Sequence, residues 1–384
     1  MKYSKEFEEY AAQIAKLACA RGISKIGAGA YSGRLPEALV EFLKESKVFY
    51  NLVSKENGGD DSLTKWLYAL REVGAQCNTT VHIMTTQSLC VHAFRISGED
   101  SDKKELYTEI ITLEKQTCFC LTEPNGGTDA GNMQTVVAKR QDGYVLTGVK
   151  NMIMNAGFAD YFLVAARLAE VPGYNGITLF LVPRKSEGLS VAPHDETLGV
   201  NGVPINTVTF KDVFVPRNCL VGKEGEGWKL CMKVLDRTRP GVAAAALGAA
   251  RTALAMCIDY SSDRMVFGKP LIKYQTTTNK IAEMGIALES AWLMTERAGL
   301  NIDEGGSDIA LTSCMAKITG TETAFQVANE ALGLFGGYGY LKDHGIEKIF
   351  RDLRVGPIYD GTNEILKGIT ATELIKKYRP VPCR

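Results

Sequence analysis

The stretch Gly227–Arg264 reads GWKLCMKVLDRTRPGVAAAALGAARTALAMCIDYSSDR, and its apolar residues recur at helical spacing over most of its length. This periodicity predicts one long helix, which Pro240 is expected to kink because proline removes a backbone hydrogen bond. The alanine and glycine residues that follow Pro240 let neighbouring helices approach closely, as they do in a four-helix bundle. The stretch therefore predicts a bundle of packed helices in the C-terminal part of the chain.

The segments on both sides of this stretch have different periods. Downstream, helical spacing returns in three runs, at 274–300, 307–335 and 361–378. Upstream, residues 116–225 form short segments rich in β-branched and aromatic residues, separated by turn clusters such as EVPGYNG and RKSEG. The first 115 residues return to helical spacing, as in FEEYAAQIAKLACA.

These patterns together predict an α+β fold built from three domains. We expect an N-terminal helical domain at 1–115, a central antiparallel β-domain at 116–225 and a C-terminal four-helix bundle at 226–384. Helices, then a sheet, then a bundle is an uncommon order of elements.

The composition excludes several classes of protein. The chain has 384 residues, of which 45% are hydrophobic, and its 44 basic and 44 acidic residues give a formal net charge of zero. This balance does not favour binding to nucleic acid or to an anionic membrane. No run of about 18 apolar residues is present, and the N-terminus resembles neither a secretory signal nor a transit peptide. We therefore expect a cytoplasmic protein without a membrane span or a nucleic-acid partner.

The ten cysteines do not form a recognisable framework. They are scattered through apolar stretches, no C-x-x-C pair occurs, and only Cys118 and Cys120 lie close together. The four histidines do not cluster either. This distribution predicts reduced cysteines used as small core residues, with no disulfide framework and no metal site.

Six motifs follow one another along the rest of the chain. They are CFCLTEPNGGTDAG (118–131), VFVPRNCLVGKEGEGW (213–228), VLDRTRPGVAAAALGAAR (234–251), DRMVFGKPLIKYQ (263–275), LGLFGGYGYLKDHGIEKIFRDLRV (332–355) and IYDGTNEI (358–365). In this order and spacing they resemble the acyl-CoA dehydrogenase family, closest to its short- and medium-chain members. The resemblance runs from about Thr117 to Tyr378 and is weaker over the first hundred residues.

The resemblance implies the three-domain fold of that family and a flavoprotein oxidoreductase. FAD would lie between the β-domain and the bundle, with part of it contacted by a neighbouring subunit of a homotetramer or, less often, a dimer. The reaction implied is removal of a proton from Cα and of a hydride from Cβ of an acyl-CoA or other acyl thioester, with the hydride passing to flavin N5. An electron-transferring flavoprotein would then reoxidise the flavin.

The catalytic base implied by the resemblance is Asp360, in the segment GPIYDGTNEI, where relatives usually have glutamate. An Asp-Gly pair by itself is typical of a turn, so the alternative is a turn residue in an enzyme that has lost its base. The match of Tyr359, Gly361 and Thr362 to the family pattern favours the catalytic interpretation. Some relatives carry the base in the LDRTRP segment, but the equivalent residue here, Thr238, is not an acid.

The resemblance also implies which residues hold the cofactor. Leu121 and Thr122 would contribute backbone groups, and Arg264 would bind the diphosphate as a bidentate donor, with a surface ion pair as the alternative. The full set expected at FAD is Phe119, Leu121, Thr122, Met152, Met154, Arg264, Phe267, Gln275, Gly336, Gly337, Thr362 and Glu364.

On the substrate side, the matching residues are Thr128, Arg239, Tyr359 and Gly361. Thr128 and Arg239 match positions that contact the CoA portion, and arginine pairs naturally with phosphate. The alternative for Arg239 is a salt bridge within the bundle. The enolate oxygen would accept hydrogen bonds from the Asp360 N–H and from the ribityl 2′-hydroxyl of the flavin.

Two departures from the family pattern lie near the flavin and the acyl group. Met152 and Met154 replace the usual tryptophan and hydroxyl residue of Trp-x-Thr, and a thioether can cover an aromatic ring but cannot donate a hydrogen bond to N5. The segment VHIMTTQSLC would run beside the acyl pocket with Thr85, Thr86 and Gln87. These polar residues either belong to a core face or contact an oxygenated or cyclic acyl group.

Three alternatives to an acyl-CoA dehydrogenase remain open from the sequence. The substrate could be linked to an acyl carrier protein instead of CoA. The altered surroundings of N5, and the use of aspartate as base by some nitroalkane-oxidising relatives, fit a flavin oxidase or monooxygenase on the same fold. The third alternative is a non-catalytic partner subunit that keeps the fold.

Overall fold

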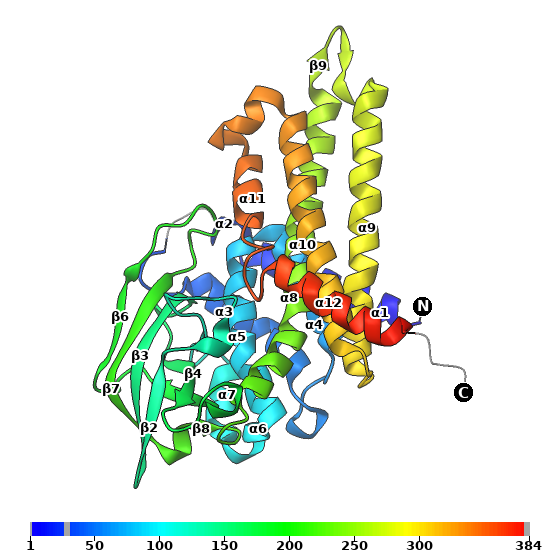
Figure 1. Cartoon of the computed structure of the whole chain (residues 1–384). Coiled ribbons are helices and arrows are strands. Elements are labelled where there is room, and N and C mark those ends of the chain that lie inside the picture. Colours follow the sequence, from blue (N-terminus) through cyan, green and yellow to red (C-terminus); the bar gives the residue numbers. More distant parts are fainter. Residues whose placement is uncertain (1, 27–30, 380–384) are drawn as a thin grey trace, which may run out of the picture.

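The computed structural model describes residues 2–26 and 31–379 and has an α+β fold (Figure 1). Helices make up the N-terminal region, a sheet the middle and long helices the C-terminal region, which confirms the predicted fold class. The N-terminal helices are α1 (Lys2–Ala20), α2 (Ile23–Ile26), α3 (Glu37–Ser46), α4 (Leu63–Gln76), α5 (Asn78–Ser97), α6 (Glu99–Asp102) and α7 (Lys104–Ile111).

The middle of the chain forms one sheet of eight strands within the described residues. These strands are β1 (Thr117–Cys120), β2 (Val136–Arg140), β3 (Gly143–Met154), β4 (Tyr161–Leu168), β5 (Ile177–Pro183), β6 (Leu189–His194), β7 (Ile205–Pro216) and β8 (Leu220–Val221). They lie in the order β6-β7-β3-β2-β4-β5-β8, with β1 paired to β4. Most pairings are antiparallel as predicted, but β1 and β2 both pair with β4 in parallel, so the sheet is mixed.

The C-terminal region begins with the long helix that its sequence predicts. Its helices are α8 (Gly227–Asp263), α9 (Gln275–Asp303), α10 (Ile309–Leu334), α11 (Ile346–Leu353) and α12 (Asn363–Tyr378). Helix α8 continues as one helix through Pro240. Figure 1 shows α8, α9 and α10 side by side, with α12 crossing them at a steep angle and the short strand β9 (Met265–Val266) at the far tip.

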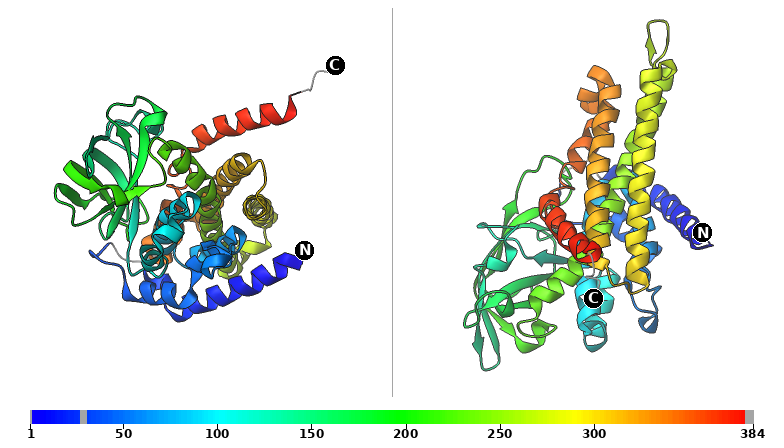
Figure 2. Two further views of the ribbon diagram at one scale, coloured as in Figure 1. Left: turned by 90° about the horizontal axis from the view of Figure 1, so that it is seen from below. Right: turned by 45° about the vertical axis from the view of Figure 1, so that its right-hand side comes forward.

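Helix α8 is the structural centre of the molecule because it packs against α4, α5, α9 and α10. Seen from below, the sheet lies to one side of this helical part (Figure 2). The small residues of α8 allow the close approach to α4. A Cβ added at Gly248 would lie 2.0 Å from the Arg71 carbonyl oxygen, and one at Gly74 would lie 2.4 Å from that of Ala245. Larger residues at either position would force the two backbones apart.

The same packing explains the apolar character of α8. Among the described residues, α8 is the one helix long and apolar enough to cross a membrane, and 67% of its most apolar window is buried. That degree of burial is typical of the central helix of a packed core.

Candidate functional site

The turn before α12 places Asp360 in an unusual backbone conformation. Asp360 has a φ of 55°, and Gly361 follows it with a φ of 90°. The turn is closed by a hydrogen bond of 3.0 Å from the Asn363 N–H to the Pro357 carbonyl, and the Thr362 side chain caps α12. A non-glycine residue with positive φ is strained, and such residues cluster at functional sites.

Helix α8 supplies two hydrogen bonds to Asp360. The Thr238 hydroxyl donates to the Asp360 carboxylate at 3.3 Å, and Arg239 Nε donates to the Asp360 carbonyl at 3.3 Å. Thr238, which cannot act as a base, therefore has a defined role beside the carboxylate. Its hydroxyl lies 3.3 Å from one carboxylate oxygen and 3.3 Å from the Leu235 carbonyl, so it can donate to either.

Helix α10 adds a buried lysine to the same turn. Lys317 is 0% exposed, and its ammonium donates to the Gly361 carbonyl and to Asn363 Oδ1, both at 2.9 Å. Asn363 is held in turn by Thr321, whose hydroxyl accepts from Asn363 Nδ2 at 3.1 Å. The base turn is thus tied to α10 through a buried charge.

Burial and charge act in opposite directions on the acid at this turn. Burial raises the pKa of the Asp360 carboxyl, and the positive charges of Lys317 and Arg239 and the Thr238 hydrogen bond only partly offset it. Burial also lowers the pKa of Lys317 to about 8, against the opposing effect of the Asp360 charge. A carboxyl with a raised pKa and a fixed position has the properties of a general base.

Arg239, which was expected on the substrate side, lies between the bundle and the base turn. Its side chain is buried, and its guanidinium donates to Asp236 at 2.7 Å and to Cys314 Sγ at 3.7 Å, besides the Asp360 carbonyl. These partners correspond to the alternative interpretation, a salt bridge within the bundle. Arg239 therefore helps to support the base turn, and its expected contact with the CoA portion stays a prediction.

The sheet side of the site is held by a buried ion pair. Lys150 and Glu123 pair at 2.9 Å with side-chain exposures of 0% and 3%. The Glu123 carboxylate also accepts from the N–H groups of Gln134 and Thr135, and Lys150 donates to the Leu121 carbonyl at 3.0 Å. This pair fixes the segment after β1, where two of the cofactor residues were expected.

The Lys150 charge and nearby hydrogen bonds set the pKa of the Glu123 carboxyl. Burial by itself would raise the pKa of the Glu123 carboxyl, but the Lys150 charge and the hydrogen bonds from Thr135, Lys150 and Gln134 outweigh it, so that the pKa lies below its ordinary value. Glu123 is therefore held as a carboxylate, which suits a structural role at this end of the sheet.

Met152 lies at a bulge of β3, and Met154 follows it in the regularly paired end of the strand. The β3–β7 register shifts between Lys150 and Ile153, and Met152 has a φ of 57° and a side chain that is 61% exposed. The Met152 N–H donates to the Asn151 side chain at 2.8 Å. β-Bulges are common next to active sites, where they redirect side chains.

Helix α5 forms a wall between the sheet and the base turn. Gln87 accepts from the Thr117 N–H at 2.7 Å and donates to the carbonyls of Ile110 and Lys115, while the Thr85 hydroxyl bonds the His82 carbonyl. Gln87 and Thr85 therefore belong to the core face, which was one of the two interpretations left open.

His82 brings α5 to the base turn. Its ring stacks on Tyr359, the neighbour of Asp360, with ring centroids 5.3 Å apart. The adjacent Ile83 carbonyl accepts from Asn155 at the end of β3 at 3.2 Å. One helix thus touches both the base turn and the strand end after Met154.

A second group of expected cofactor residues lies far from Asp360. Arg264 follows Thr238 by 26 residues (264 minus 238), which corresponds to about 39 Å along an α-helix. Arg264, Gly336 and Gly337 border a hollow of about 480 Å³ together with Tyr260 and Tyr338. Phe267 lies at the tip of the hairpin that follows α8 and is 95% exposed. Gln275 is the first residue of α9.

This hollow suits a flat, charged ligand. A Cβ at Gly336 or Gly337 would meet no atom within 4 Å, so the backbone there is open to a ligand. The Arg264 guanidinium lies over the Tyr338 ring at 5.3 Å, and Tyr260 stacks on Phe335. Aromatic rings, bare backbone and an arginine fit an adenine nucleotide.

The remaining predicted residues are placed as follows. Phe119 is partly buried on β1, Leu121 and Thr122 follow it, and Thr128 is exposed in the next loop. The Thr122 carbonyl accepts from the Asn151 N–H at 2.9 Å, which joins two of the expected flavin segments. Glu364 is exposed on the first turn of α12 and contacts Lys367.

Two residues at the base turn were not anticipated from the sequence. Lys317 stands in a helical run where a single lysine is ordinarily solvent-exposed, and His82 is one of two histidines, with His92, on a largely apolar helix. No local pattern distinguishes them. Only a lysine in the otherwise uncharged window LTSCMAKITGT gives a signal for Lys317.

Comparison with known proteins identifies the relatives of this chain. Residues 118–213 match the family model described as acyl-CoA dehydrogenase, middle domain, and residues 225–375 match that described as acyl-CoA dehydrogenase, C-terminal domain. A short-chain-specific acyl-CoA dehydrogenase of Megasphaera elsdenii is 34% identical over 325 residues, 84% of each chain.

Solved structures agree with this. The structure of butyryl-CoA dehydrogenase from Megasphaera elsdenii has a TM-score of 0.90 and 31% identity, covering 98% of both chains. A structure described as an electron transferring flavoprotein of Acidaminococcus fermentans has a TM-score of 0.90 and 29% identity, again over 98% of both chains.

Proposed function

Because this chain belongs to the acyl-CoA dehydrogenase family, we propose that it is an FAD-dependent enzyme that desaturates an acyl-CoA between Cα and Cβ, with Asp360 as the base. The observation that carries the proposal is the position of the Asp360 carboxylate. Asp360 lies on a turn and has a positive φ. The Thr238 hydroxyl is within hydrogen-bonding distance of its carboxylate, and the positive charge of the buried Lys317 stabilises the ionised form. Burying the Lys317 charge next to this turn is energetically costly, and we take this cost as support for a functional role of Asp360.

Asp360 offers both groups that removal of an α-proton requires. Its carboxylate accepts the proton from Cα, and its own N–H makes no backbone hydrogen bond within residues 2–26 and 31–379. That N–H is therefore available to donate to the thioester oxygen as negative charge develops there. Because the base and the donor to the thioester oxygen belong to the same residue, they position the substrate carbonyl and its α-carbon together.

FAD fits the residues on both sides of the molecule. The segment after β1 and the bulge at Met152 would hold its flavin part, and the start of α12 with the hollow beside Arg264 would hold adenine and diphosphate. When bound, FAD supplies the acceptor for the hydride that leaves Cβ. Met152 covers a ring face without donating a hydrogen bond.

The separation of these two groups supports a homo-oligomer. Since about 39 Å of helix lies between Thr238 and Arg264 in one chain, a second copy must contribute the Arg264 end to complete each site. The exposed Phe267 at the hairpin tip is an aromatic anchor of the kind found at interfaces. We propose a homotetramer in which neighbouring chains share the cofactor site.

The physiological setting follows from the relatives and from the cysteines. We propose that an electron-transferring flavoprotein reoxidises the enzyme, as the structural relative from Acidaminococcus fermentans suggests. The nine cysteines within the described residues are all free thiols, which suits a reducing cytoplasm.

Anaerobic titration of the purified yellow protein with acyl-CoAs tests this function. Short, branched, aromatic and cyclic acyl-CoAs are added in turn while the flavin absorbance is followed. Bleaching by one of them establishes a dehydrogenase. A yellow protein that none bleaches favours a carrier-bound substrate or an oxidase, and a protein that cannot take up FAD favours a non-catalytic subunit.

Lys317→Met is expected to move the acid limb of the pH–rate profile to higher pH. The lysine charge stabilises the Asp360 carboxylate, so its removal raises the carboxyl pKa further above its ordinary value. The active, ionised form of the base is then lost at a higher pH as the solution is acidified. The pH dependence of kcat/KM for flavin reduction measures this shift.

Thr321→Val is the matched control for that prediction. It removes a neutral hydrogen bond to Asn363 in the same cluster but no charge. We expect it to leave the position of the acid limb unchanged. An equal shift in both variants would show that Lys317 acts on the geometry of the turn and not on its charge.

A further inference from the structure

A small enclosed cavity lies next to the base turn, between α5, α8 and α11. Its volume is about 10 Å³, and its lining includes Asn78, His82, Val242, Asp352 and Tyr359. A space of this size holds one small polar group or one water molecule, not a ring.

The cavity adjoins the base turn and the part of α8 that contacts it. Tyr359 forms one of its walls and is the direct neighbour of Asp360. Val242 follows Thr238 by one helical turn, so the cavity begins about 6 Å along α8 from the hydroxyl that holds the base. That distance corresponds to a chain of a few carbon atoms beyond Cα.

Polar atoms without partners face this region. Within the described residues, both side-chain atoms of Asn78 and the Nε2 of His82 are buried and make no hydrogen bond. The two residues are 7% and 4% exposed. A buried polar group without a hydrogen bond is destabilising, so such atoms around one cavity indicate a ligand that pairs with some of them.

The hydrogen-bond sense of His82 follows from its other nitrogen. Nδ1 lies 2.7 Å from the Asn78 carbonyl, so Nδ1 carries the proton and Nε2 is an acceptor. Burial lowers the pKa of His82, which keeps the ring neutral. Asn78 offers the two N–H donors of Nδ2 and the acceptor Oδ1, so the unpaired atoms are two acceptors and one donor nitrogen.

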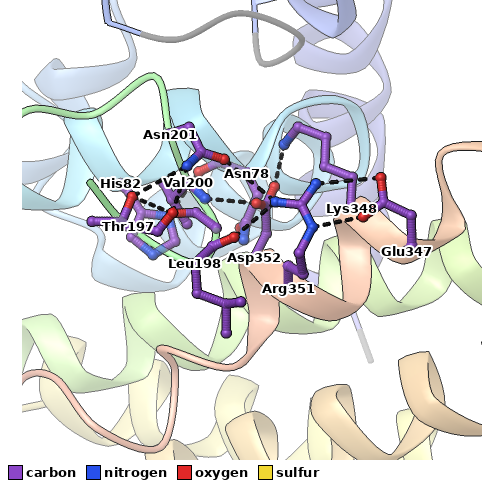
Figure 3. A network of polar contacts seen from close by, with 11 residues as sticks. Asn78, His82, Thr197, Leu198, Val200, Asn201, Glu347, Lys348, Arg351 and Asp352 are labelled. Carbon is purple, nitrogen blue, oxygen red and sulfur yellow. Dashed lines mark hydrogen bonds and ion pairs between the residues drawn. The ribbon is translucent and has the colours of Figure 1, made fainter. Parts of the chain in front are cut away.

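The charges around the cavity exclude an anionic ligand. Asp352, which lines the cavity, accepts from the Val200 N–H at 2.6 Å and pairs with Lys348, as Figure 3 shows beside Asn78 and His82. The Lys348 charge is therefore paired with Asp352. Arg351 forms an ion pair with Glu347 and donates a hydrogen bond to the Leu198 carbonyl. A carboxylate end group would face Asp352 without a free cation.

Resting on the proposed function, we propose that the acyl group oxidised by this enzyme carries one neutral hydroxyl at its far end, bound by Asn78 and His82. The hydroxyl donates to His82 Nε2 and accepts from Asn78 Nδ2, so two of the three unpaired atoms gain a partner. A plain alkyl end would leave these atoms unpaired, and sites built for a hydroxyl reject analogues that lack it.

The test compares acyl-CoAs that end in a hydroxyl with unsubstituted ones of the same length. 4-Hydroxybutyryl-CoA, 5-hydroxypentanoyl-CoA and 6-hydroxyhexanoyl-CoA are each measured against butyryl-, pentanoyl- and hexanoyl-CoA. For at least one pair, we expect kcat/KM for flavin reduction to favour the hydroxylated member about tenfold or more. Calorimetric binding of the same pairs to the Asp360→Asn protein is expected to show the same preference without turnover.

Two variants connect the preference to the cavity. His82→Phe, which keeps a ring against Tyr359, and Asn78→Leu should each reduce the preference to about twofold or reverse it. His92→Phe is the matched control, because His92 is also a buried histidine of α5 with an unpaired Nε2 but does not line the cavity. It should leave the preference intact.

The outcomes separate this inference from the proposed function. If unsubstituted acyl-CoAs bleach the flavin and hydroxylated ones gain nothing in rate or binding, the cavity holds only a water and the inference is wrong while the function stands. If no acyl-CoA of either kind reduces the flavin, the proposed function fails. In that case a calorimetric preference that His82→Phe abolishes would still support the hydroxyl site.

Discussion

The Asp360→Asn protein is expected to reduce its flavin about 10²- to 10⁴-fold more slowly than wild type with any acyl-CoA that bleaches the wild-type enzyme. Asparagine has nearly the shape of aspartate and can keep the contact with the Thr238 hydroxyl, but it cannot accept the α-proton. Anaerobic stopped-flow measurement of flavin reduction gives the rate directly.

The FAD content and the melting temperature of the variant must stay near those of wild type for this loss to be catalytic. Asp142→Asn, which changes an exposed carboxylate in the turn between β2 and β3, is the matched control and should reduce its flavin at the wild-type rate. Normal flavin reduction by Asp360→Asn would remove Asp360 from the role of base and reopen the interpretation as a turn residue.

The second large effect is expected on stability, at the Glu123–Lys150 pair. Glu123→Ala leaves the Lys150 charge buried without its partner and two backbone N–H groups without an acceptor. Removing one partner of a buried pair costs about 3–5 kcal/mol. Thermal unfolding of the holoprotein should therefore show a clear decrease in melting temperature.

A surface pair provides the contrast. Glu330→Ala removes the partner of Lys280, where the side chains are 47% and 43% exposed, and about 0–1 kcal/mol is expected. The double variant Glu123→Met with Lys150→Met should recover part of the loss, because it no longer buries a lone charge. Equal effects of Glu123→Ala and Glu330→Ala would contradict the assigned importance of the buried pair.

The contribution of Glu123 should also depend on pH in a defined sense. Its folded-state pKa lies below the ordinary value, so the contribution is fully present above the unfolded-state pKa of about 4.3. It is lost as the pH falls through the depressed folded-state pKa. The difference in melting temperature between wild type and Glu123→Ala should therefore narrow in acid.

Much of the fold could be predicted from the sequence because its signals are local. The long run from Gly227, the short strands after residue 116 and the helical N-terminal region each carry the period of their own secondary structure. Parallel pairing of β1 and β2 with β4 could not be predicted, because alternation records which face is buried and not which strand lies alongside. The domain boundaries at 115/116 and 225/226 stay predictions.

Part of the candidate site could also be predicted from the sequence, and part of it could not. By itself, the sequence determined the family, the order of helices and sheet, and the acid Asp360 in the segment GPIYDGTNEI, because these are carried by motifs within a few residues of one another. Only the tertiary structure decided that Lys317 supports the Asp360 turn and that Arg239 binds Asp236 and the Asp360 carbonyl. It also decided that His82 stacks on Tyr359. The physical reason is that these contacts, except the Asp236–Arg239 pair, join residues that are far apart in the chain and meet only when α5, α8, α10 and the base turn pack together. No local period or spacing encodes which side chains such packing brings into contact.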